Sequence, residues 1–242
     1  MRLTALHHVT AICSDAPQTV RFYRDELGFR LVKKTVNFDD PGSYHLYFGD
    51  ETGAPGTLLT FFEWPQAARG RLGRGTLEAI ALSVPGQEGV KELEDPDGLR
   101  LELHPGERLG LDHVRAYGDP GFTSDILAEG SPIRYVPPPA HVALLGAGTT
   151  HHIAWRVSGD EEQEAWRRHL PELGLRPTEV LDRKYFRSVY FRMPDGILVE
   201  LATDGPGFAV DEERDALGTR LSLPDWLEPE RPTLERELTP IS

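Results

Sequence analysis

Two segments decide the fold: LHHVTAI at residues 6–12 and THHIAW at residues 150–155. In each segment a pair of histidines precedes apolar residues, which predicts a β-strand. A strand that occurs twice with the same histidine pair indicates an internal repeat, and a repeat determines the architecture of the whole chain. The residues that follow each histidine pair therefore show how long the repeated unit is.

A helix is predicted after each of these strands. Apolar residues recur near helical spacing over residues 16–27 and 161–173. Each helix is expected to end at a Leu-Gly pair, at residues 27–28 and 173–174, because glycine readily adopts the left-handed conformation that terminates a helix.

Further strands complete the repeated unit. Residues 44–48 match residues 188–192 as strands, and residues 56–60 match residues 196–200 as the last strand. The unit reads as strand, helix and three strands, which is a βαβββ module. The two copies cover roughly residues 4–64 and 149–204.

Two shortened copies are predicted between the full modules. The first begins with a strand at residues 77–84 and ends with PDGLRLEL at residues 96–103, which nearly repeats PDGILVEL at residues 194–201. Only about ten residues lie between its two strands, too few for a helix and two more strands. The second is expected to begin at residues 111–114 and to end near residues 142–145.

The predicted fold class is therefore α+β, with repeated βαβββ modules that form curved mixed sheets, two full modules outside and two shortened modules in the centre. The last segment is rich in proline and acidic residues and is expected to wrap around the body, with Leu221, Leu223 and Trp226 as packing points. The predicted segments are residues 1–70 (first module), 71–148 (two shortened central modules), 149–204 (last module, paired with the first around a metal) and 205–242 (C-terminal extension).

Composition excludes several classes of protein. The 242 residues include 26 basic and 39 acidic side chains, so the formal charge is −13 and nucleic-acid binding through a basic face is not expected. No apolar run approaches the ~20 residues of a membrane helix, and the first residues lack the apolar core of a signal peptide. Cys13 is the only cysteine, which excludes an intrachain disulfide and a cysteine-based zinc site. We therefore expect a cytoplasmic protein with no membrane partner.

Superposition of the copies gives the candidate metal ligands. Histidines from two opening strands and a glutamate from a closing strand would converge where two modules form a cleft. Two imidazoles and one carboxylate are typical of non-haem Fe(II) sites, which keep other coordination positions open for substrate and O₂. The opening-strand residues are His8, Ala79, His113 and His152, and the closing-strand residues are Thr60, Glu102 and Glu200.

The preferred triad is His8, His152 and Glu200, because the two full modules match in length and can pair. Thr60 stands in the first module where Glu200 stands in the last. A glutamate there would give four protein ligands, as in a closed Lewis-acid site, whereas threonine leaves three.

A second triad of His113, His152 and Glu200 is an alternative. Its two histidines are closer together in sequence than a full module requires. Glu102 has Ala79 instead of a histidine in its own module, so it is expected to be a turn-adjacent or surface carboxylate.

Several motifs resemble the vicinal oxygen chelate superfamily, and within it the ring-cleaving dioxygenases that act on hydroquinones. The resemblance covers the first module, the last module and the tail. It implies Fe(II) held by His8, His152 and Glu200, in agreement with the comparison of the modules, with Mn(II) as a second choice. The motifs are HHVT at residues 7–10, LVKKTVNFDDPG at 31–42, THHIA at 150–154 and ELATD at 200–204.

The resemblance also implies residues that act near the substrate oxygens. The matching positions are His7, Thr10, His151, Arg183 and Tyr190. Arg183 would hold a phenolate through charge-assisted hydrogen bonds, Tyr190 would hydrogen-bond a substrate oxygen, and His151 would move a proton. His7 and His151 would lie behind the ligand histidines, because neighbouring strand residues point to opposite faces.

The expected function is extradiol-type cleavage of a hydroquinone- or catechol-type ring, with a small aromatic substrate and O₂ as the partners. Two alternatives stay open: a glyoxalase- or epimerase-like enzyme that uses Zn(II) or Ni(II) as a Lewis acid, and a non-catalytic protein of the same fold that sequesters a small molecule. The sequence also leaves the oligomeric state open, with a homodimer as one option. Residues 75–148 are compressed relative to the family, in which the central modules help to shape the substrate cavity.

Overall fold

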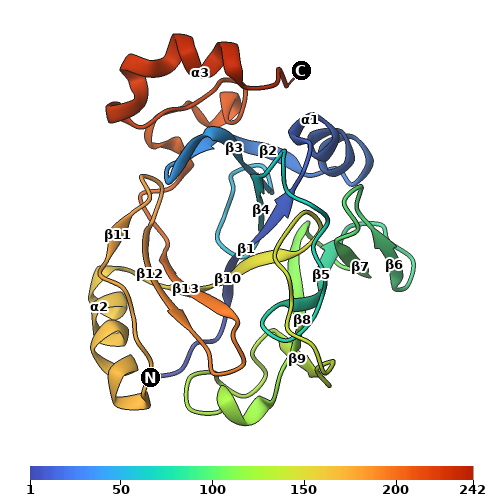
Figure 1. The fold of residues 1–242 in the computed structure, drawn as a ribbon, viewed down its shortest axis with the longest axis vertical. Helices are drawn as coiled ribbons and strands as arrows, with labels where there is room; N and C mark the ends of the chain where they lie inside the picture. Colours follow the sequence, from blue (N-terminus) through green and yellow to red (C-terminus); the bar gives the residue numbers. More distant parts are fainter. Residues whose placement is uncertain (242) are drawn as a thin grey trace.

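Two curved sheets form the body of the molecule in the computed structural model, which describes residues 1–241. Within that range the larger sheet has eight strands in the order β11-β12-β13-β10-β1-β4-β3-β2, and the smaller has five in the order β6-β7-β5-β8-β9. The strands that carry the two histidine pairs, β1 and β10, are antiparallel neighbours at the centre of the larger sheet (Figure 1). The first and last parts of the chain thus share one sheet.

Both outer modules contain the full βαβββ order, as the sequence predicts. The first consists of β1 (Leu6–Cys13), α1 (Ala16–Val20) with a π-helical continuation (Arg21–Glu26), β2 (Arg30–Asn37), β3 (Asp40–Gly49) and β4 (Leu58–Glu63). The last consists of β10 (Thr150–Val157), α2 (Asp160–His169) with a 3-10 turn (Leu170–Leu173), β11 (Leu181–Asp182), β12 (Arg187–Arg192) and β13 (Leu198–Thr203).

Local sequence explains where the two helices begin and end. Asp15 caps α1 by accepting a hydrogen bond from the backbone N–H of Gln18 at 2.7 Å. Gly28 and Gly174 both have a φ of 77°, the left-handed conformation expected after each helix. Trp166 of α2 is fully buried where the helix contacts β12 and β13, so its apolar face holds the helix on the sheet.

The two central modules contain no α-helix in the part of the chain that the structure describes. One consists of β5 (Leu77–Val84), β6 (Lys91–Glu94) and β7 (Arg100–Pro105), and the other of β8 (Gly110–Tyr117) and β9 (Ile133–Val136). Two full outer modules around two shortened ones are therefore confirmed.

The predicted end of the fourth copy is wrong. Its last strand is β9, which pairs in parallel with β8, whereas residues 142–145 form only isolated bridges to Arg71 and Arg74. Val142 and Leu144 are 59% and 58% exposed. The apolar residues of this segment are typical of a strand, but they do not pack into the core.

The predicted match between residues 44–48 and 188–192 is wrong by one position. Tyr47 pairs with Thr60, and Tyr190 pairs with Glu200, which are the equivalent positions of the two closing strands. Tyr47 is therefore the counterpart of Tyr190. Because side chains alternate along a strand, His45 lies on the same face as Tyr47.

The C-terminal segment lies beside β2 and β3 at one end of the molecule (Figure 1). Its helix α3 (Arg231–Glu237) contacts β3, and Ser222 N donates a hydrogen bond to Lys34 O at 2.8 Å. Leu221 and Leu223 are buried, as predicted, whereas Trp226 is 62% exposed and packs with its ring edge-to-face on Phe38, with the ring centres 5.6 Å apart. Among the described helices, none has the length and apolar character needed to span a membrane.

Candidate metal centre

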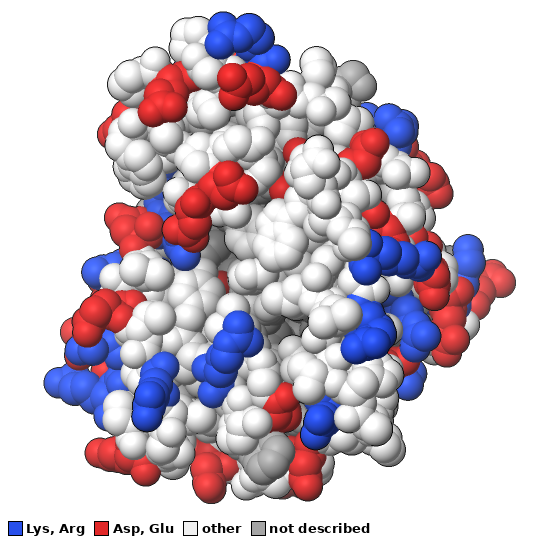
Figure 2. All heavy atoms as spheres, in the orientation of Figure 1, with Lys and Arg blue, Asp and Glu red and all other residues white. Residues whose placement is uncertain are grey.

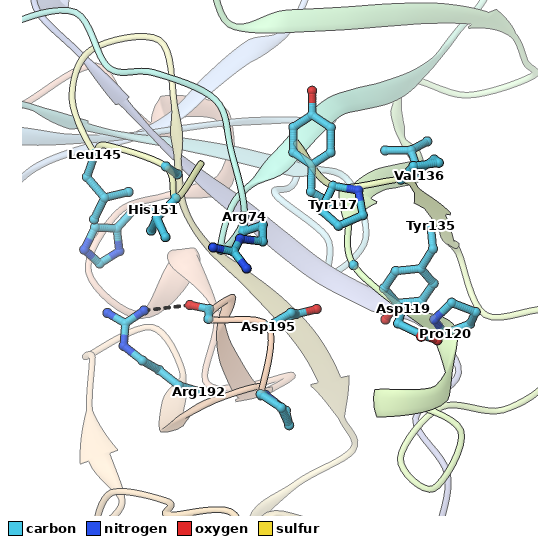
Figure 3. A pocket seen from close by; sticks show the side chains of 18 residues that line it. Arg74, Tyr117, Asp119, Pro120, Tyr135, Val136, Leu145, His151, Arg192 and Asp195 are labelled. Atoms are coloured by element: carbon cyan, nitrogen blue, oxygen red, sulfur yellow. Dashed lines mark hydrogen bonds between the residues drawn. The ribbon is translucent and has the colours of Figure 1, made fainter. Parts of the chain in front are cut away.

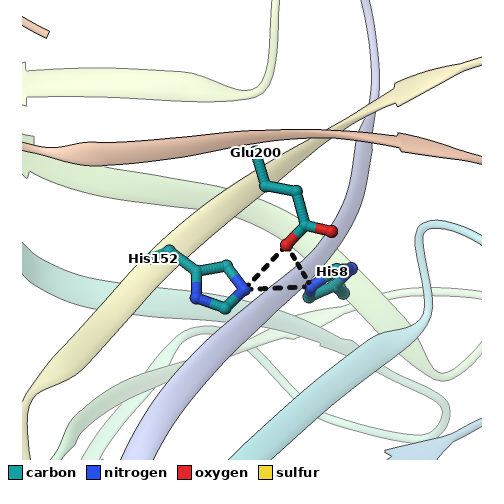
Figure 4. Close-up of side chains that lie close together, drawn as sticks. All are labelled: His8, His152 and Glu200. Atoms are coloured by element: carbon teal, nitrogen blue, oxygen red, sulfur yellow. Dashed lines mark hydrogen bonds and ion pairs between the residues drawn. The ribbon is translucent and has the colours of Figure 1, made fainter. Parts of the chain in front are cut away.

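Three side chains from three adjacent strands converge at the centre of the larger sheet (Figure 4). His8 Nε2 lies 3.2 Å from His152 Nε2 and 3.2 Å from Glu200 Oε2, and His152 Nε2 lies 2.9 Å from the same oxygen. The strand register explains this convergence. Ala154 of β10 pairs with His8 on one side and with Glu200 on the other, and its small side chain leaves room between them.

The neighbouring histidines determine which ring nitrogen of His8 carries a proton. His7 Nε2 lies 3.1 Å from Thr203 O, and a carbonyl can only accept, so Nε2 of His7 donates. Burial lowers the pKa of His7 to about 3, so its ring is neutral and its Nδ1 can only accept. His8 Nδ1, 2.9 Å away, then carries the proton, and His8 Nε2 presents a lone pair to the cluster.

His151 stands in the same relation to His152. Their Nδ1 atoms are 2.8 Å apart, and burial lowers the pKa of His151 to about 3. Burial also lowers the pKa of His152, which keeps that imidazole neutral. For Glu200 burial alone would raise the pKa, but the two imidazoles that face its carboxylate outweigh burial and lower the pKa well below the usual range, so Glu200 is ionised.

These protonation states fit a bound divalent metal. Glu200 Oε2 is buried and has no hydrogen-bond partner among the described residues. A carboxylate oxygen and two neutral imidazole nitrogens that face one another at about 3 Å are the donor set of a metal with ligand distances of about 2.0–2.2 Å. Ser188 Oγ holds the second oxygen of Glu200 by a short hydrogen bond, which fixes the carboxylate in place.

Hydroxyl groups of two threonines lie beside the three converging side chains, and one of them, Thr60, stands where a fourth ligand would be expected. Thr10 Oγ1 lies 2.9 Å from His152 Nε2 and 2.7 Å from Thr60 Oγ1. Thr60 Oγ1 also lies 3.1 Å from His45 Nε2, and the other ring nitrogen of His45 lies 2.9 Å from the hydroxyl of Tyr47. Thr60 thus takes part in a hydrogen-bond chain at the position where the other module has Glu200.

A small cavity of about 30 Å³ opens over the three converging residues. Arg183 and Tyr190 line it, together with aromatic rings that include Phe62 and Phe186. The guanidinium of Arg183 lies 5.5 Å from the centre of the Tyr190 ring and forms an ion pair with Asp39 at 3.2 Å. Burial and the charge of Glu200 raise the pKa of Tyr190, so its phenol stays protonated.

A second and much wider cavity has a volume of about 1090 Å³ (Figure 3). Arg74, Tyr117, Arg192 and Asp195 line it, and His151 is the residue of the two histidine pairs that reaches it. On the face drawn in Figure 2 the surface is hollowed near its centre, where the side chains are mostly uncharged, with acidic and basic residues around the hollow. The size of the wide cavity does not make it the chemical centre, because none of the three converging side chains lines it.

The structure separates the predicted site residues into groups. His8, His152 and Glu200 converge, and Arg183 and Tyr190 line the small cavity above them. His7 and His151 lie behind the two converging histidines, and Thr10 touches His152.

The alternative triad is not assembled. His113 belongs to β8 of the smaller sheet, where it lies near Glu102 and His104. The expectation for Glu102 is wrong as well, because this side chain is only 6% exposed and forms an ion pair with Arg115.

His45 is a cavity residue that the sequence analysis missed. Burial lowers its pKa well below the usual value, so the ring is neutral. The alternation of side chains along β3 places His45 on the same face as Tyr47, the counterpart of Tyr190. The predicted match of the two strands is one residue off, and it therefore turns His45 away from the cavity.

Comparison with known proteins agrees with this geometry. Residues 5–85 and 107–201 match the Glyoxalase/Bleomycin resistance protein/Dioxygenase superfamily. The "Putative ring-cleaving dioxygenase MhqO" of Bacillus subtilis (strain 168) is 37% identical over 98% of this chain and 96% of its own. A chlorohydroquinone/hydroquinone 1,2-dioxygenase of Sphingobium indicum is 27% identical over 94% of this chain and 93% of its own.

Solved structures show the same relationship. A crystal structure of a "putative dioxygenase" from Bacillus subtilis has a TM-score of 0.91 at 34% identity and covers 100% of this chain and 98% of that chain. A variant of glyoxalase I from Zea mays shares the fold, with a TM-score of 0.62 at 15% identity over 83% of this chain and 92% of that one. The chain therefore belongs to the glyoxalase, bleomycin resistance protein and dioxygenase superfamily, also called the vicinal oxygen chelate superfamily.

Proposed function

We propose that this protein is a metal-dependent dioxygenase that opens a hydroquinone- or catechol-type ring with O₂, and that His8, His152 and Glu200 hold Fe(II). The observation that carries the proposal is the convergence of two imidazole nitrogens and one carboxylate oxygen at about 3 Å beneath an aromatic-lined cavity. The names of the relatives favour the same reaction class. Mn(II) has similar ligand preferences and is the second choice of metal.

Thr60 separates this proposal from a glyoxalase- or epimerase-like reaction. Lewis-acid sites of that kind would draw a fourth ligand from the closing strand of the first module. Here that position has a hydroxyl that is already hydrogen-bonded to Thr10 and to His45. A three-ligand site keeps more positions open, which suits a reaction in which an aromatic substrate and O₂ are brought together.

The residues around the cavity would prepare the substrate. Bound Fe(II) would supply the redox chemistry that O₂ requires. Arg183 would favour the ionised form of a phenol through its fixed positive charge. Tyr190 stays protonated and would donate a hydrogen bond to a substrate oxygen. His45 also lines the cavity with a neutral ring, so we propose it beside His151 as a second candidate for accepting the proton of the substrate.

A ring-sized substrate requires the cavity to open, because about 30 Å³ is close to the volume of a water molecule. The side chain of Asp39, which pairs with Arg183 over the cavity, is 73% exposed. Exposed ion pairs contribute about 0–1 kcal/mol. Separating this pair therefore costs little, and the turn between β2 and β3 can yield to the substrate.

The test is metal content together with O₂ consumption on a panel of hydroquinones and catechols. The variants His8→Ala, His152→Ala and Glu200→Gln should each lose one equivalent of Fe(II) and all O₂ consumption, and remain folded. His169→Ala, a change of a surface histidine, is the matched control. Wild-type iron content in His8→Ala would refute the ligand set.

The two alternatives have distinct outcomes in the same experiment. A Zn(II)- or Ni(II)-loaded protein that isomerises a hemithioacetal and consumes no O₂ would establish the Lewis-acid enzyme. Tight binding of an aromatic compound without metal and without turnover would establish a sequestering protein.

A further inference from the structure

The smaller sheet repeats the centre of the larger one strand for strand. The order β7-β5-β8-β9 corresponds to β13-β10-β1-β4. In both sheets the first and third of these pairings are parallel and the middle pairing is antiparallel. Each position around the candidate metal centre therefore has a counterpart in the central modules.

The register identifies the counterparts of two ligands. Ala154 pairs with both His8 and Glu200 in the larger sheet. Ala81 of β5 occupies the same place and pairs with both His113 and Glu102. His113 thus corresponds to His8, and Glu102 corresponds to Glu200.

The third ligand, His152, has no histidine as its counterpart in the smaller sheet, and His104 from a different position takes its place. His152 pairs with Thr10 in the larger sheet, and its counterpart Ala79 pairs with Arg115. Alanine cannot bind a metal, but His104 stands two residues after Glu102 on β7 and therefore on the same face. His104 Nε2 lies 3.0 Å from Glu102 Oε2, and the three ligand atoms lie within 4.8 Å of one another.

His113 is oriented as a metal ligand. Its Nδ1 donates a hydrogen bond to Asp112 Oδ1 at 2.5 Å, so its Nε2 has a lone pair when the ring is neutral. That Nε2 atom is buried, has no hydrogen-bond partner among the described residues, and points at Glu102 Oε2 from 4.0 Å. A carboxylate behind the histidine is the usual support of a metal-bound imidazole. Asp112 precedes His113 as His7 precedes His8.

Glu102 Oε2, the oxygen that faces both His104 and His113, is free of other ion pairs among the described residues and can bind a metal. Arg115 pairs with the other oxygen, Oε1, and so fixes the carboxylate without covering Oε2. Glu102 lines an open cavity of about 340 Å³, where Glu78, Glu92 and Glu94 stand beside Arg100 and Arg115, so this carboxylate can be reached from solvent. The side chain of His104 is 17% exposed, so an ion reaches the cluster without unfolding of the sheet.

We propose that Glu102, His104 and His113 form a second metal site that binds a divalent transition metal such as Zn²⁺, with water in the fourth position. Two imidazoles and one carboxylate suit Zn²⁺, whose tetrahedral ligands lie about 3.3 Å apart. The pair at 3.0 Å is close to this spacing, and the pair at 4.0 Å must close by less than 1 Å. The ion would join β7 to β8 across β5, so its role is to stabilise the central modules, whose described residues form no α-helix.

The experiment titrates metal-free protein with Zn²⁺ and measures the number of equivalents by calorimetry and the change in melting temperature. We expect two equivalents in the wild type. His104→Ala and His113→Asn should each bind one equivalent and lose part of the zinc-induced rise in melting temperature. Asp112→Ala, a change of the positioning residue, should weaken the second equivalent about 10–100-fold.

Two controls keep this site distinct from the candidate centre of the larger sheet. His8→Ala should lose the other equivalent and retain the one that depends on His104. His169→Ala should retain both equivalents. A single equivalent in the wild type, or two in His104→Ala, overturns the proposal. Because His104 is partly exposed, its replacement tests the site even if His113→Asn does not fold.

Discussion

The Nδ1 atom of His151 lies 2.8 Å from the Nδ1 atom of His152, and His7 makes the same contact with His8 at 2.9 Å. Each proposed ligand is thus held by the residue before it in the chain, although strand neighbours usually point to opposite faces. A bulge in the pairing of β1 with β10 between Leu6 and His8 accompanies this arrangement. The histidine pair is therefore one unit, with one ring toward the metal and one ring behind it.

The first prediction concerns this unit. His7→Ala and His151→Ala should each weaken binding of Fe(II) or Zn²⁺ at the cluster about 10–100-fold, because the ligand ring loses the partner that sets its tautomer and orientation. Competition with a chelator of known affinity measures the change. His169→Ala serves as the control, and unchanged affinity in both variants would show that the pairs have no influence on the metal.

Particular residues show how far the sequence could predict this molecule. The outer modules were predictable because the histidine pairs, the helical spacing and Gly28 and Gly174 all give local signals. His45 was not, because a one-residue shift in a strand moves every side chain to the other face, and short apolar runs do not determine the register. The prediction of a strand at residues 142–145 is wrong for a related reason. An apolar run in the sequence does not show whether its side chains are buried against a sheet.

The cluster of Glu102, His104 and His113 could not be predicted from the sequence for a different reason. Superposition of the copies could pair Glu102 with Ala79 but not with His104, which has no counterpart in the other modules. Only the register of three strands brings His104 and His113 to one carboxylate. His104 stands at a position where the other modules have no ligand, so a comparison of equivalent positions in the modules does not find it.

The second prediction concerns the attachment of the C-terminal segment. Lys33 is fully buried and donates to Asp211 at 2.7 Å and, by a short contact, to Glu212. Lys33→Ala should lower the free energy of unfolding by about 3–5 kcal/mol, because the buried carboxylate of Glu212 loses its nearest cation, whereas Asp211 keeps Lys184. Denaturant unfolding measures the loss. Lys34→Ala is the matched control and should cost less, and the double variant Lys33→Met with Glu212→Gln should recover part of it.

The third prediction is a pH dependence that arises from Asp95. Burial raises the pKa of this carboxyl to about 6 from its ordinary value of 3.8, although it accepts hydrogen bonds from Leu99 N and from Tyr23 at 3.0 Å. A raised pKa in the folded state favours folding while the group is protonated. The contribution is therefore complete below pH 3.8 and is lost as the pH rises through 6.

The measurement compares the wild type with Asp95→Asn at pH 5 and pH 8. Relative to the variant, the wild type should lose about 1.4 kcal/mol of unfolding free energy between these values. Asparagine does not titrate in this range, so other groups cancel in the comparison. Parallel pH profiles for the two proteins would show that Asp95 is ionised throughout.

The fourth prediction tests His45 as the proton acceptor. His45→Gln retains a polar side chain near Thr60 but removes the base, so kcat should fall about 10²–10⁴-fold. Iron content should not change, because His45 is not one of the three converging side chains. Turnover at the wild-type rate with an unaltered pH profile would assign the proton to another group.

The last prediction concerns Arg183 and Tyr190, which line the cavity over the cluster and contact each other through the guanidinium and the ring. Tyr190→Phe deletes one hydroxyl, and Arg183→Ala removes the cation that would hold a phenolate. A charge-assisted hydrogen bond contributes about 1.5–3 kcal/mol, so each change should lower kcat/KM roughly tenfold to a hundredfold. Iron content should stay normal in both, which separates substrate recognition from metal binding. Asp39→Ala controls for the loss of the Arg183 ion pair, and it should retain most activity since the Asp39 side chain is 73% exposed. If both Arg183→Ala and Tyr190→Phe turn over the best substrate at the wild-type rate, the aromatic substrate does not bind in this cavity, and the wide cavity beside His151 becomes the place to test.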